Sequence, residues 1–327
     1  MMFTFLQDNF HFSRISKKLE TLYPHDSDES SIVRNSGEIF KTQHCNIHDF
    51  RQYINVSDNV LYECVKTIAA ENLSICAYPT KSDLVSRILR KKGAFEIDFN
   101  RAIMSALDLY PNAAFLDIGA NIGMHSLVAA KRGKRVFAVE PNVDTVKRLH
   151  KSVNLNRLQE NFTLIRNGIS DVRESLTLTI DNTNRGRSSF VYNAGATSHT
   201  VETILFDDLR EVISVPEVVI KIDVEMAEAR AFKFSKEFFK KVKVNVIFME
   251  WQCFTKYKVM LEPKPGSPAN KIRDHEDFKE MLKNLYFMGF IPKKIEYPFE
   301  NTLASTENFT KTDMLKWPAD VVWVRNI

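Results

Sequence analysis

The stretch FLDIGANIGMHS, residues 115–126, decides how this chain is expected to fold. It begins as a buried strand, passes through a turn with two glycines and continues into a helix. The 327 residues include only 10 glycines, so the pair at Gly119 and Gly123 is a concentrated signal. Gly119 permits a close approach between backbone and ligand, and Asn121 is a candidate N-cap for the helix. The stretch therefore predicts a ligand-binding turn at the mouth of a parallel sheet.

Short apolar runs alternate with helical periods around this turn, which is the pattern of a parallel sheet with helices on both faces. Helices are expected at residues 122–131, 142–156 and 227–239, and a longer helical stretch at 83–109 is broken near Gly93. The predicted fold class is α/β, with a Rossmann-like and mostly parallel sheet. The expected strands are residues 114–118, 135–140, 162–167, 218–223 and 245–250.

Two segments depart from this alternation. Residues 175–180 and 188–192 flank a turn-like sequence and predict an inserted β-hairpin. Residues 290–297 and 321–325 predict an antiparallel closing pair, joined by a loop without a crossover helix.

The first 80 residues carry little chemical signal. They predict a helical and irregular N-terminal extension ahead of an α/β domain at residues 81–327. Val60, Val65, Ile68 and Ala69 suggest one amphipathic helix, and residues 73–78 suggest a short strand.

Acidic residues end the first two predicted strands of the parallel sheet. Asp117 is placed to meet a positively charged or amino-bearing group, and Glu140, one βαβ step later, can accept hydrogen bonds from both hydroxyls of a ribose. The turn between them lacks the G-x-G-x-x-G pattern of dinucleotide sites. These features favour S-adenosylmethionine as the ligand, with Gly168, Ile169 and Asp171 expected near its adenine.

Four ordered motifs resemble the FkbM family of S-adenosylmethionine-dependent methyltransferases. They are FLDIGANIGMHS, the VEPN of residues 139–142, the IKIDVEMAE of residues 220–228 and the FMEW of residues 248–251. The resemblance covers about residues 84–325. It implies a class I methyltransferase fold and usually an oxygen acceptor. The donor-binding positions that it implies are Asp117, Gly119, Asn121, Gly123, Glu140 and Asn142.

Methyl transfer requires that the acceptor be aligned and, if it is a hydroxyl, deprotonated. Asp223 is the leading candidate for this role, because the ends of neighbouring strands bring it near Glu250. His199, in a polar loop, is a third candidate, since histidine titrates near physiological pH. Lys221 and Glu228 are expected to form a structural ion pair.

One motif departs from the family pattern and leaves a second function open. Met226 stands where the family commonly has glycine. The alternative is a catalytically silent domain that binds the donor or a partner protein. A nicotinamide oxidoreductase is disfavoured by the missing glycine pattern.

Composition limits the class of partner. Hydrophobic residues make up 44% and charged residues 26% of the chain, and 45 basic against 41 acidic residues leave a net charge of +4. These values fit a globular enzyme and give no reason to expect a nucleic-acid partner. With no membrane span visible, we expect a cytoplasmic protein that acts on a small-molecule, glycan or lipid acceptor. The sequence leaves the oligomeric state open.

The four cysteines are widely spaced and lack the clustering of a metal site. We therefore expect neither a metal ion nor a disulfide. Sequons such as that at Asn72 are interpreted as chance, because they matter only in an exported protein.

Overall fold

The structure is a computed structural model. It describes residues 39–48, 50, 62–81, 83–179, 189–190, 198–225, 227–251, 269–306, 309 and 317–325. Residues Gly37–Ile327 form one compact unit. None of the helices within the described ranges combines the length and apolar character that a membrane span requires.

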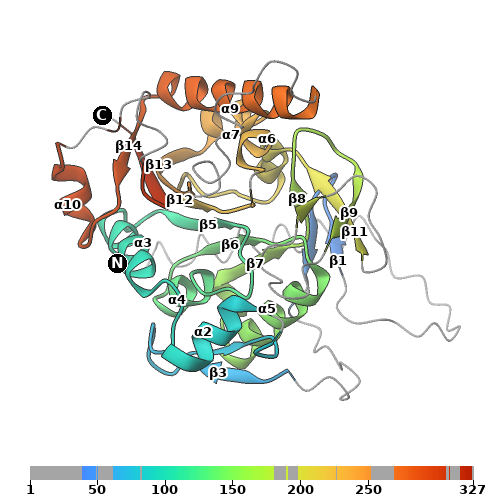
Figure 1. The fold of residues 1–327 in the computed structure, drawn as a ribbon. Coiled ribbons are helices and arrows are strands. Elements are labelled where there is room, and N and C mark those ends of the chain that lie inside the picture. The colour runs from blue at the N-terminus through green and yellow to red at the C-terminus, as the bar shows by residue number, and fades with distance from the viewer. Residues whose placement is uncertain are drawn as a thin grey trace, which may run out of the picture. The chain divides into compact units, whose positions relative to one another are not determined.

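A nine-stranded sheet forms the centre of this unit (Figure 1). Its middle is parallel and runs in the order β7, β6, β5, β12, β13, which is the doubly wound arrangement that reverses direction beside β5. These strands are β5 (Ala114–Ile118), β6 (Val136–Val139), β7 (Phe162–Ile165), β12 (Glu217–Ile222) and β13 (Lys243–Glu250). All five expected strands are therefore present, and the predicted α/β class is confirmed.

Antiparallel strands complete both edges of the sheet. On one side β15 (Asp320–Arg325) pairs with β13 and with β14 (Phe290–Lys294), which confirms the predicted closing pair. On the other side β2 (Asn46–His48) pairs with β7 and with β1 (Ile39–Lys41), which was not predicted. The loop before β15 also contains a short helix, α10 (Phe299–Ala304), which is not a crossover helix, because β14 and β15 are antiparallel neighbours as expected.

Helices cover both faces of the sheet. The helical stretch breaks where predicted, because Gly93 takes a left-handed conformation (φ 78°) between α2 (Leu84–Lys92) and α3 (Ile97–Leu109). The helix expected at 227–239 is instead split into α6 (Glu228–Phe232) and α7 (Lys236–Lys241). The remaining helices are α4 (Ser126–Lys131), α5 (Val143–Leu155) and α9 (Ala269–Phe287).

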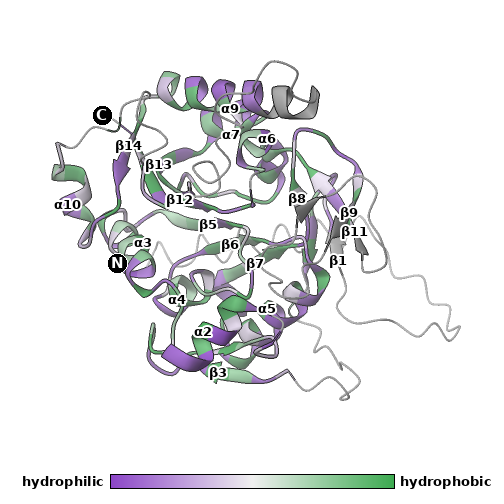
Figure 2. Ribbon diagram, in the orientation of Figure 1, coloured by the Kyte–Doolittle hydropathy of each residue, from purple (hydrophilic) through white to green (hydrophobic). Residues whose placement is uncertain are grey.

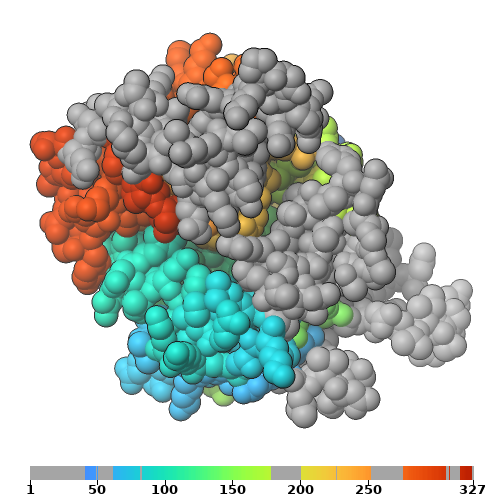
Figure 3. Space-filling view, viewed as in Figure 1, coloured from blue at the N-terminus to red at the C-terminus, as the bar shows by residue number. Residues whose placement is uncertain are grey.

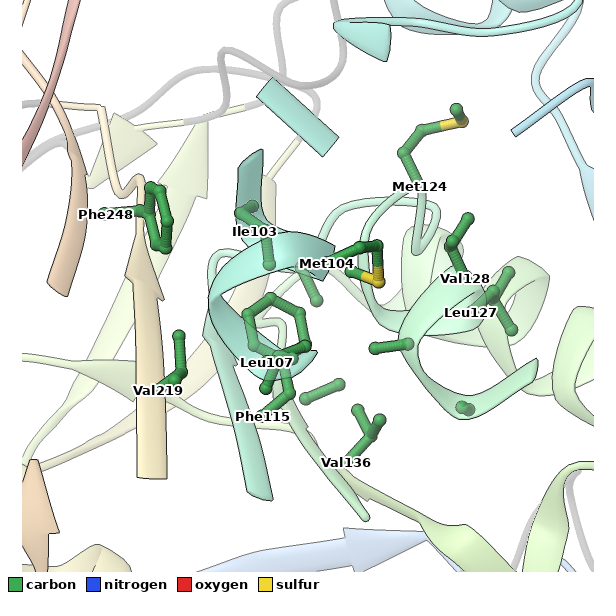
Figure 4. Close-up of a cluster of buried hydrophobic side chains, with 14 of the residues drawn as sticks. Ile103, Met104, Leu107, Phe115, Met124, Leu127, Val128, Val136, Val219 and Phe248 are labelled. Atoms are coloured by element: carbon green, nitrogen blue, oxygen red, sulfur yellow. The ribbon is translucent and has the colours of Figure 1, made fainter. Parts of the chain in front are cut away.

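Alternating strand residues supply two separate cores. Phe115 and Val219 pack with α3 and α4 on one face (Figure 4), whereas Leu116 and Ile220 belong to the core on the other face. The second core includes α9, whose buried positions recur at helical spacing and along which purple and green alternate in Figure 2. A side chain on an odd-numbered position of β12 therefore points toward α3 and α4.

The predicted inserted hairpin is confirmed. Strands β9 (Ser175–Thr179) and β10 (Ser189–Phe190) are antiparallel, and β9 also pairs with β11 (Ser198–Ile204). The far end of β11 pairs in parallel with β8 (Gly168–Ile169).

The segment before α2 differs from expectation. The helix predicted around Val65 is absent, because Val65 lies in β3 (Cys64–Lys66) and pairs with Ile75 of β4 (Ser74–Cys76). The strand predicted at 73–78 is present as β4. Backbone groups of β4 bond to Ser152 and Asn156 of the α5 region, so tertiary contacts override a short helical period. Figure 3 shows this hairpin at the surface beside α2.

A disulfide joins Cys64 to Cys76, directly opposite each other in the β3–β4 pairing. The expectation of four free thiols was wrong, because the thiols meet through strand register although 12 residues separate them. Disulfides persist mainly in oxidising compartments. This disulfide therefore gives no support to the expected cytoplasmic location, which remains a prediction.

Loss of this bond should lower stability, because a disulfide restricts the unfolded chain. We expect the Cys64→Ala/Cys76→Ala variant to lose about 2–4 kcal/mol of unfolding free energy, and thiol reduction of the wild type to produce a similar loss. Thermal unfolding with and without reductant measures both effects. Peptide mapping that finds both cysteines as free thiols in oxidised protein would contradict the assignment.

The turn after β5 is locked against the turn after β12. Gly119 has φ +79°, and a Cβ atom on it would lie 1.8 Å from the backbone oxygen of Asp223. The Asp223 backbone nitrogen also donates to the Ile118 oxygen at 3.0 Å. The close approach expected at Gly119 is therefore made by the chain's own backbone, which fixes the spacing of the two turns.

A side chain at Gly119 should lower the stability of the fold, because it would overlap the backbone of Asp223 even when no ligand is bound. Gly133 is a matched control, because it has φ +81° and a Cβ atom on it would meet nothing within 4 Å. Both Gly119→Ala and Gly133→Ala incur the left-handed backbone cost, and we expect Gly119→Ala to lose a further ~1–3 kcal/mol or more through overlap. Urea unfolding compares the two. Equal losses would show that the Asp223 contact is unimportant.

Candidate active site

Glu140 organises the expected donor side of the site. It follows β6, and its two carboxylate oxygens accept from the backbone nitrogens of Asn121 and Asn142, each at 2.9 Å. The backbone nitrogens of Gly119 and Ala120 donate to the Val139 oxygen at 2.9 and 3.0 Å. These bonds tie the turn after β5 to the end of β6, as the sequence predicts for the two motifs.

The surroundings of Glu140 fit a ribose. Burial raises the pKa of this carboxyl to about 7, against the lowering effect of the two backbone hydrogen bonds and of Lys221. Each carboxylate oxygen has a second lone pair, so the group retains acceptor capacity for hydroxyls. The buried Asn142 side-chain nitrogen has no hydrogen-bond partner among the described residues and offers a further donor. The residues present are therefore suited to a nucleoside such as that of S-adenosylmethionine.

Asn121 and Gly123 shape the turn in ways that the sequence did not indicate. Helix α4 begins at Ser126, so the expectation that Asn121 caps it was wrong. Asn121 instead takes a left-handed conformation (φ 50°), and its side-chain oxygen accepts from the Ile122 nitrogen. At Gly123 a Cβ would lie 2.4 Å from a Leu149 methyl carbon, so this glycine permits close packing on α5.

Asp117 meets a cation of the chain itself. It is fully buried, pairs in register with Lys221 of β12, and lies 3.6 Å from the Lys221 ammonium nitrogen. Lys221 also donates to the Gly119 oxygen at 2.9 Å and lies 3.4 Å from an Asp223 oxygen. Lys221 thus pairs with Asp117 and Asp223, and the expected ion pair with Glu228 was wrong.

Glu228 instead supports the turn that follows β12. It is completely buried, and one carboxylate oxygen accepts from the Val224 nitrogen at 3.0 Å. Burial, opposed by the backbone hydrogen bonds and assisted by the charges of Asp223 and Glu225, raises its pKa to about 8. The neighbouring Met226 lies outside the described residues.

The residues expected near adenine follow β7, whose Ile165 oxygen accepts from the Glu140 backbone nitrogen at 3.0 Å. Gly168 and Ile169 are buried in β8. Burial acts to raise the pKa of Asp171, but the positive charge of Arg230 and its hydrogen bond outweigh burial and lower this pKa below its usual value. In that bond the Arg230 Nε donates to an Asp171 carboxylate oxygen at 2.9 Å. An ionised, paired carboxylate has less capacity for an exocyclic amine, so adenine contacts by these three residues remain a prediction.

His199 lies in a strand, and the expected loop position was wrong. It belongs to β11 and pairs in register with Leu178 of β9. Strands β9 and β11 form part of a four-stranded sheet that is separate from the nine-stranded sheet of the parallel strands. A catalytic role for His199 remains a prediction.

The ends of four neighbouring strands form one level row, defined here as the carboxyl row. Register pairs Ile118 with Ile222, Ile222 with Met249, and Glu250 with Asp320. The residues at this level are therefore Gly119, Asp223, Glu250 and Asp320. Oxygens of Asp223, Glu225 and Glu250 all lie within 4.8 Å of one another, as expected for Asp223 and Glu250. This spacing also suits a cation, although the sequence predicts no metal ion.

Asp320 of the carboxyl row and two further residues, Glu96 and His125, were not predicted as part of the acceptor side. Asp320 starts an antiparallel strand, Glu96 precedes α3, and His125 precedes α4. The Glu96 carboxylate lies 3.5 Å from a His125 ring nitrogen. An acidic residue just before the apolar run of β15 is a sequence signal for Asp320, but only the antiparallel direction brings it to this edge.

Comparison with known proteins identifies the family. The Methyltransferase FkbM domain model matches residues 117–292, more than half of the chain. No curated protein matches. Similar solved structures include a candidate O-methyltransferase from Klebsiella pneumoniae, with 11% identity, 77% of this chain and 91% of that chain covered, and a TM-score of 0.42. An O-methyltransferase from Bacillus cereus in complex with SAH has 8% identity, 70% and 80% coverage and a TM-score of 0.39.

The matched region contains both the donor turn and the strand ends of the carboxyl row that precede Asp320. Three of the four motifs that suggested the family lie wholly within it, and the first enters it at Asp117. The chain belongs to the FkbM family of S-adenosylmethionine-dependent methyltransferases.

Proposed function

We propose that this methyltransferase methylates an oxygen atom, transferring the methyl group of S-adenosylmethionine to a hydroxyl of its acceptor. The observation that carries the proposal is the carboxyl row, in which Asp223 and Glu250 stand level with the donor turn at Gly119. A hydroxyl must lose a proton during methyl transfer, and carboxylates beside the donor turn are suitable proton acceptors or orienting groups.

Each part of the site has a distinct task in this proposal. When bound, S-adenosylmethionine supplies an electrophilic methyl group on its sulfonium sulfur. Glu140 and Asn142 hold the ribose, and the turn from Gly119 to Gly123 lies against the rest of the donor. Asp223, fixed by Lys221, orients the acceptor hydroxyl, and Glu250 supports it from the next strand. Alignment of the acceptor oxygen is the main contribution of these groups.

The charge of this region favours an acceptor without negative charge. Asp223, Glu225, Glu250 and Asp320 lie around one buried lysine, Lys221. Such an excess of carboxylates repels phosphates and favours groups that donate hydrogen bonds. A glycan, an uncharged lipid or a neutral small molecule therefore fits better than a nucleic acid.

A labelled-methyl screen tests this function. Purified protein is incubated with methyl-labelled S-adenosylmethionine and separate glycan, lipid and small-molecule fractions, and the labelled product is identified by NMR. An O-methyl product is expected. Donor binding without transfer to any fraction would support the alternative of a catalytically silent domain.

Replacement of Glu140 should weaken donor binding. A charged hydrogen bond contributes about 1.5–3 kcal/mol, so loss of two ribose bonds in Glu140→Ala should weaken S-adenosylhomocysteine binding by tenfold or more. Calorimetry measures the affinity. Glu160→Gln is the control, because this exposed glutamate precedes β7 at the opposite end of the strand. Unchanged affinity in folded Glu140→Ala would exclude the ribose role.

The pH dependence of binding provides a second measurement on Glu140. Its pKa is about 7 in the ligand-free protein, and the ionised form is the better acceptor for hydroxyls. Affinity for S-adenosylhomocysteine should therefore rise between pH 6 and pH 8, by up to about tenfold for one group with this pKa. The Glu140→Gln variant should lose this rise. A wild-type affinity that falls over the same interval would contradict the prediction.

Replacement of Asp223 should separate catalysis from donor binding. Asp223→Asn retains side-chain shape, and the donor contacts lie elsewhere, so affinity for S-adenosylhomocysteine should stay within a few fold. Turnover should fall by about 100 to 10,000 fold, the usual contribution of a positioned acid–base group. Glu250→Gln is the matched comparison and should lose less. Equal losses of affinity and turnover in Asp223→Asn would instead make Asp223 a donor-binding residue.

A further inference from the structure

Asp320 reaches the acceptor side through the direction of its strand. It is the first residue of β15, which is antiparallel to β13, so its register partner is Glu250 at the last position of β13. Two residues later, Val322 belongs to the same core as Phe248, on the face covered by α3 and α4. Because strand side chains alternate, Asp320 and Glu250 belong to this same face of the sheet.

Charged groups on three other elements surround Asp320. Glu96 approaches from the start of α3, His125 from the residue before α4, and both Asp223 and Lys221 from β12. Burial, followed by the charges of Glu96 and Asp223, raises the pKa of Asp320 to about 7, and His125 and Lys221 act in the opposite direction. Glu250 is its neighbour in the pairing of β13 and β15.

Asp320 and Asp223 differ in what they contact. Asp223 lies 3.4 Å from the Lys221 ammonium, so one of its carboxylate oxygens already faces a cation of the chain. The Asp320 side chain makes no hydrogen bond or ion pair with the residues that the structure describes. It is also partly accessible, so a proton can reach it from a bound acceptor.

We propose that Asp320 is a further catalytic residue, the base that takes the proton of the acceptor hydroxyl. This inference rests on the proposed O-methylation. As the proton passes to an Asp320 oxygen, the acceptor oxygen forms its bond to the methyl carbon. The electron pair of the broken carbon–sulfur bond stays on sulfur, which becomes a neutral thioether. Asp320 then releases the proton to solvent, while Asp223 orients the hydroxyl.

The pH dependence of the rate follows from this role. Only the ionised form of Asp320 can accept the proton, so the rate should rise with pH until the group is fully ionised. With a pKa of about 7, the wild-type kcat/KM for the acceptor should rise about tenfold per pH unit below that value and level off above it. This rise of the rate with pH is the acidic limb of the pH profile.

The test compares Asp320→Asn, Asp320→Glu and Asp223→Asn with the wild type between pH 5.5 and pH 9, using the acceptor from the screen. Labelled S-adenosylmethionine is kept saturating at every pH, so that ionisation of Glu140 does not alter the rate. Asp320→Asn should lose about 100 to 10,000 fold in kcat/KM at pH 8 and should lack the limb near pH 7. Asp320→Glu should restore part of the rate and the limb. Asp223→Asn should be slow but keep the limb.

Calorimetry with S-adenosylhomocysteine provides a readout independent of turnover. Asp320→Asn should bind it within about twofold of the wild type, since the donor contacts are on other strands. A parallel loss of affinity and rate, or an Asp320→Asn profile that keeps the limb near pH 7, would overturn the inference. An O-methylating wild type with an unaffected Asp320→Asn variant refutes only this inference, whereas a wild type that methylates nitrogen refutes the proposed function as well.

Discussion

The buried ammonium of Lys221 connects the parts of the site. It lies between Asp117 of β5 and Asp223 at the end of β12, and it donates to the Gly119 carbonyl oxygen. A lysine taken out of water needs opposite charge and hydrogen bonds to remain ionised, and these three partners supply both. Burial acts to lower the Lys221 pKa, but the charges of Asp223 and Asp117 outweigh it and raise the pKa. The donor turn and the acceptor carboxylate are thereby held in one arrangement.

Backbone contacts between the turns after β5 and β12 also hold these groups in place. The absence of a side chain at Gly119 allows the Asp223 carbonyl to approach the turn, and the Ile118 carbonyl accepts from the Asp223 nitrogen. The same turn is fixed on its other side by the Val139 carbonyl and the Glu140 carboxylate. Neighbouring strands thus share one rigid edge, on which a small displacement of one turn would move the groups of the next.

The two sides of the site differ in their electrostatics. Glu140 is surrounded by backbone donors that hold it in place although burial raises its pKa. On the acceptor side, carboxylates crowd one another, and their mutual repulsion raises the pKa of Asp320 beyond the effect of burial. Both carboxyl groups thus have a pKa of about 7, but backbone donors fix Glu140, whereas the Asp320 side chain has no hydrogen-bond partner among the described residues.

The sequence by itself determined the parallel sheet, its strand positions, the donor turn and the family, because these depend on local periodicity and on motifs within a few residues. It also indicated Asp223 and Glu250, whose proximity follows from the order of parallel strands. Only the tertiary structure decided which groups pair with Lys221, that Cys64 meets Cys76, and that Asp320 joins the carboxyl row. These contacts depend on strand direction and register between segments far apart in the chain, which local patterns do not encode.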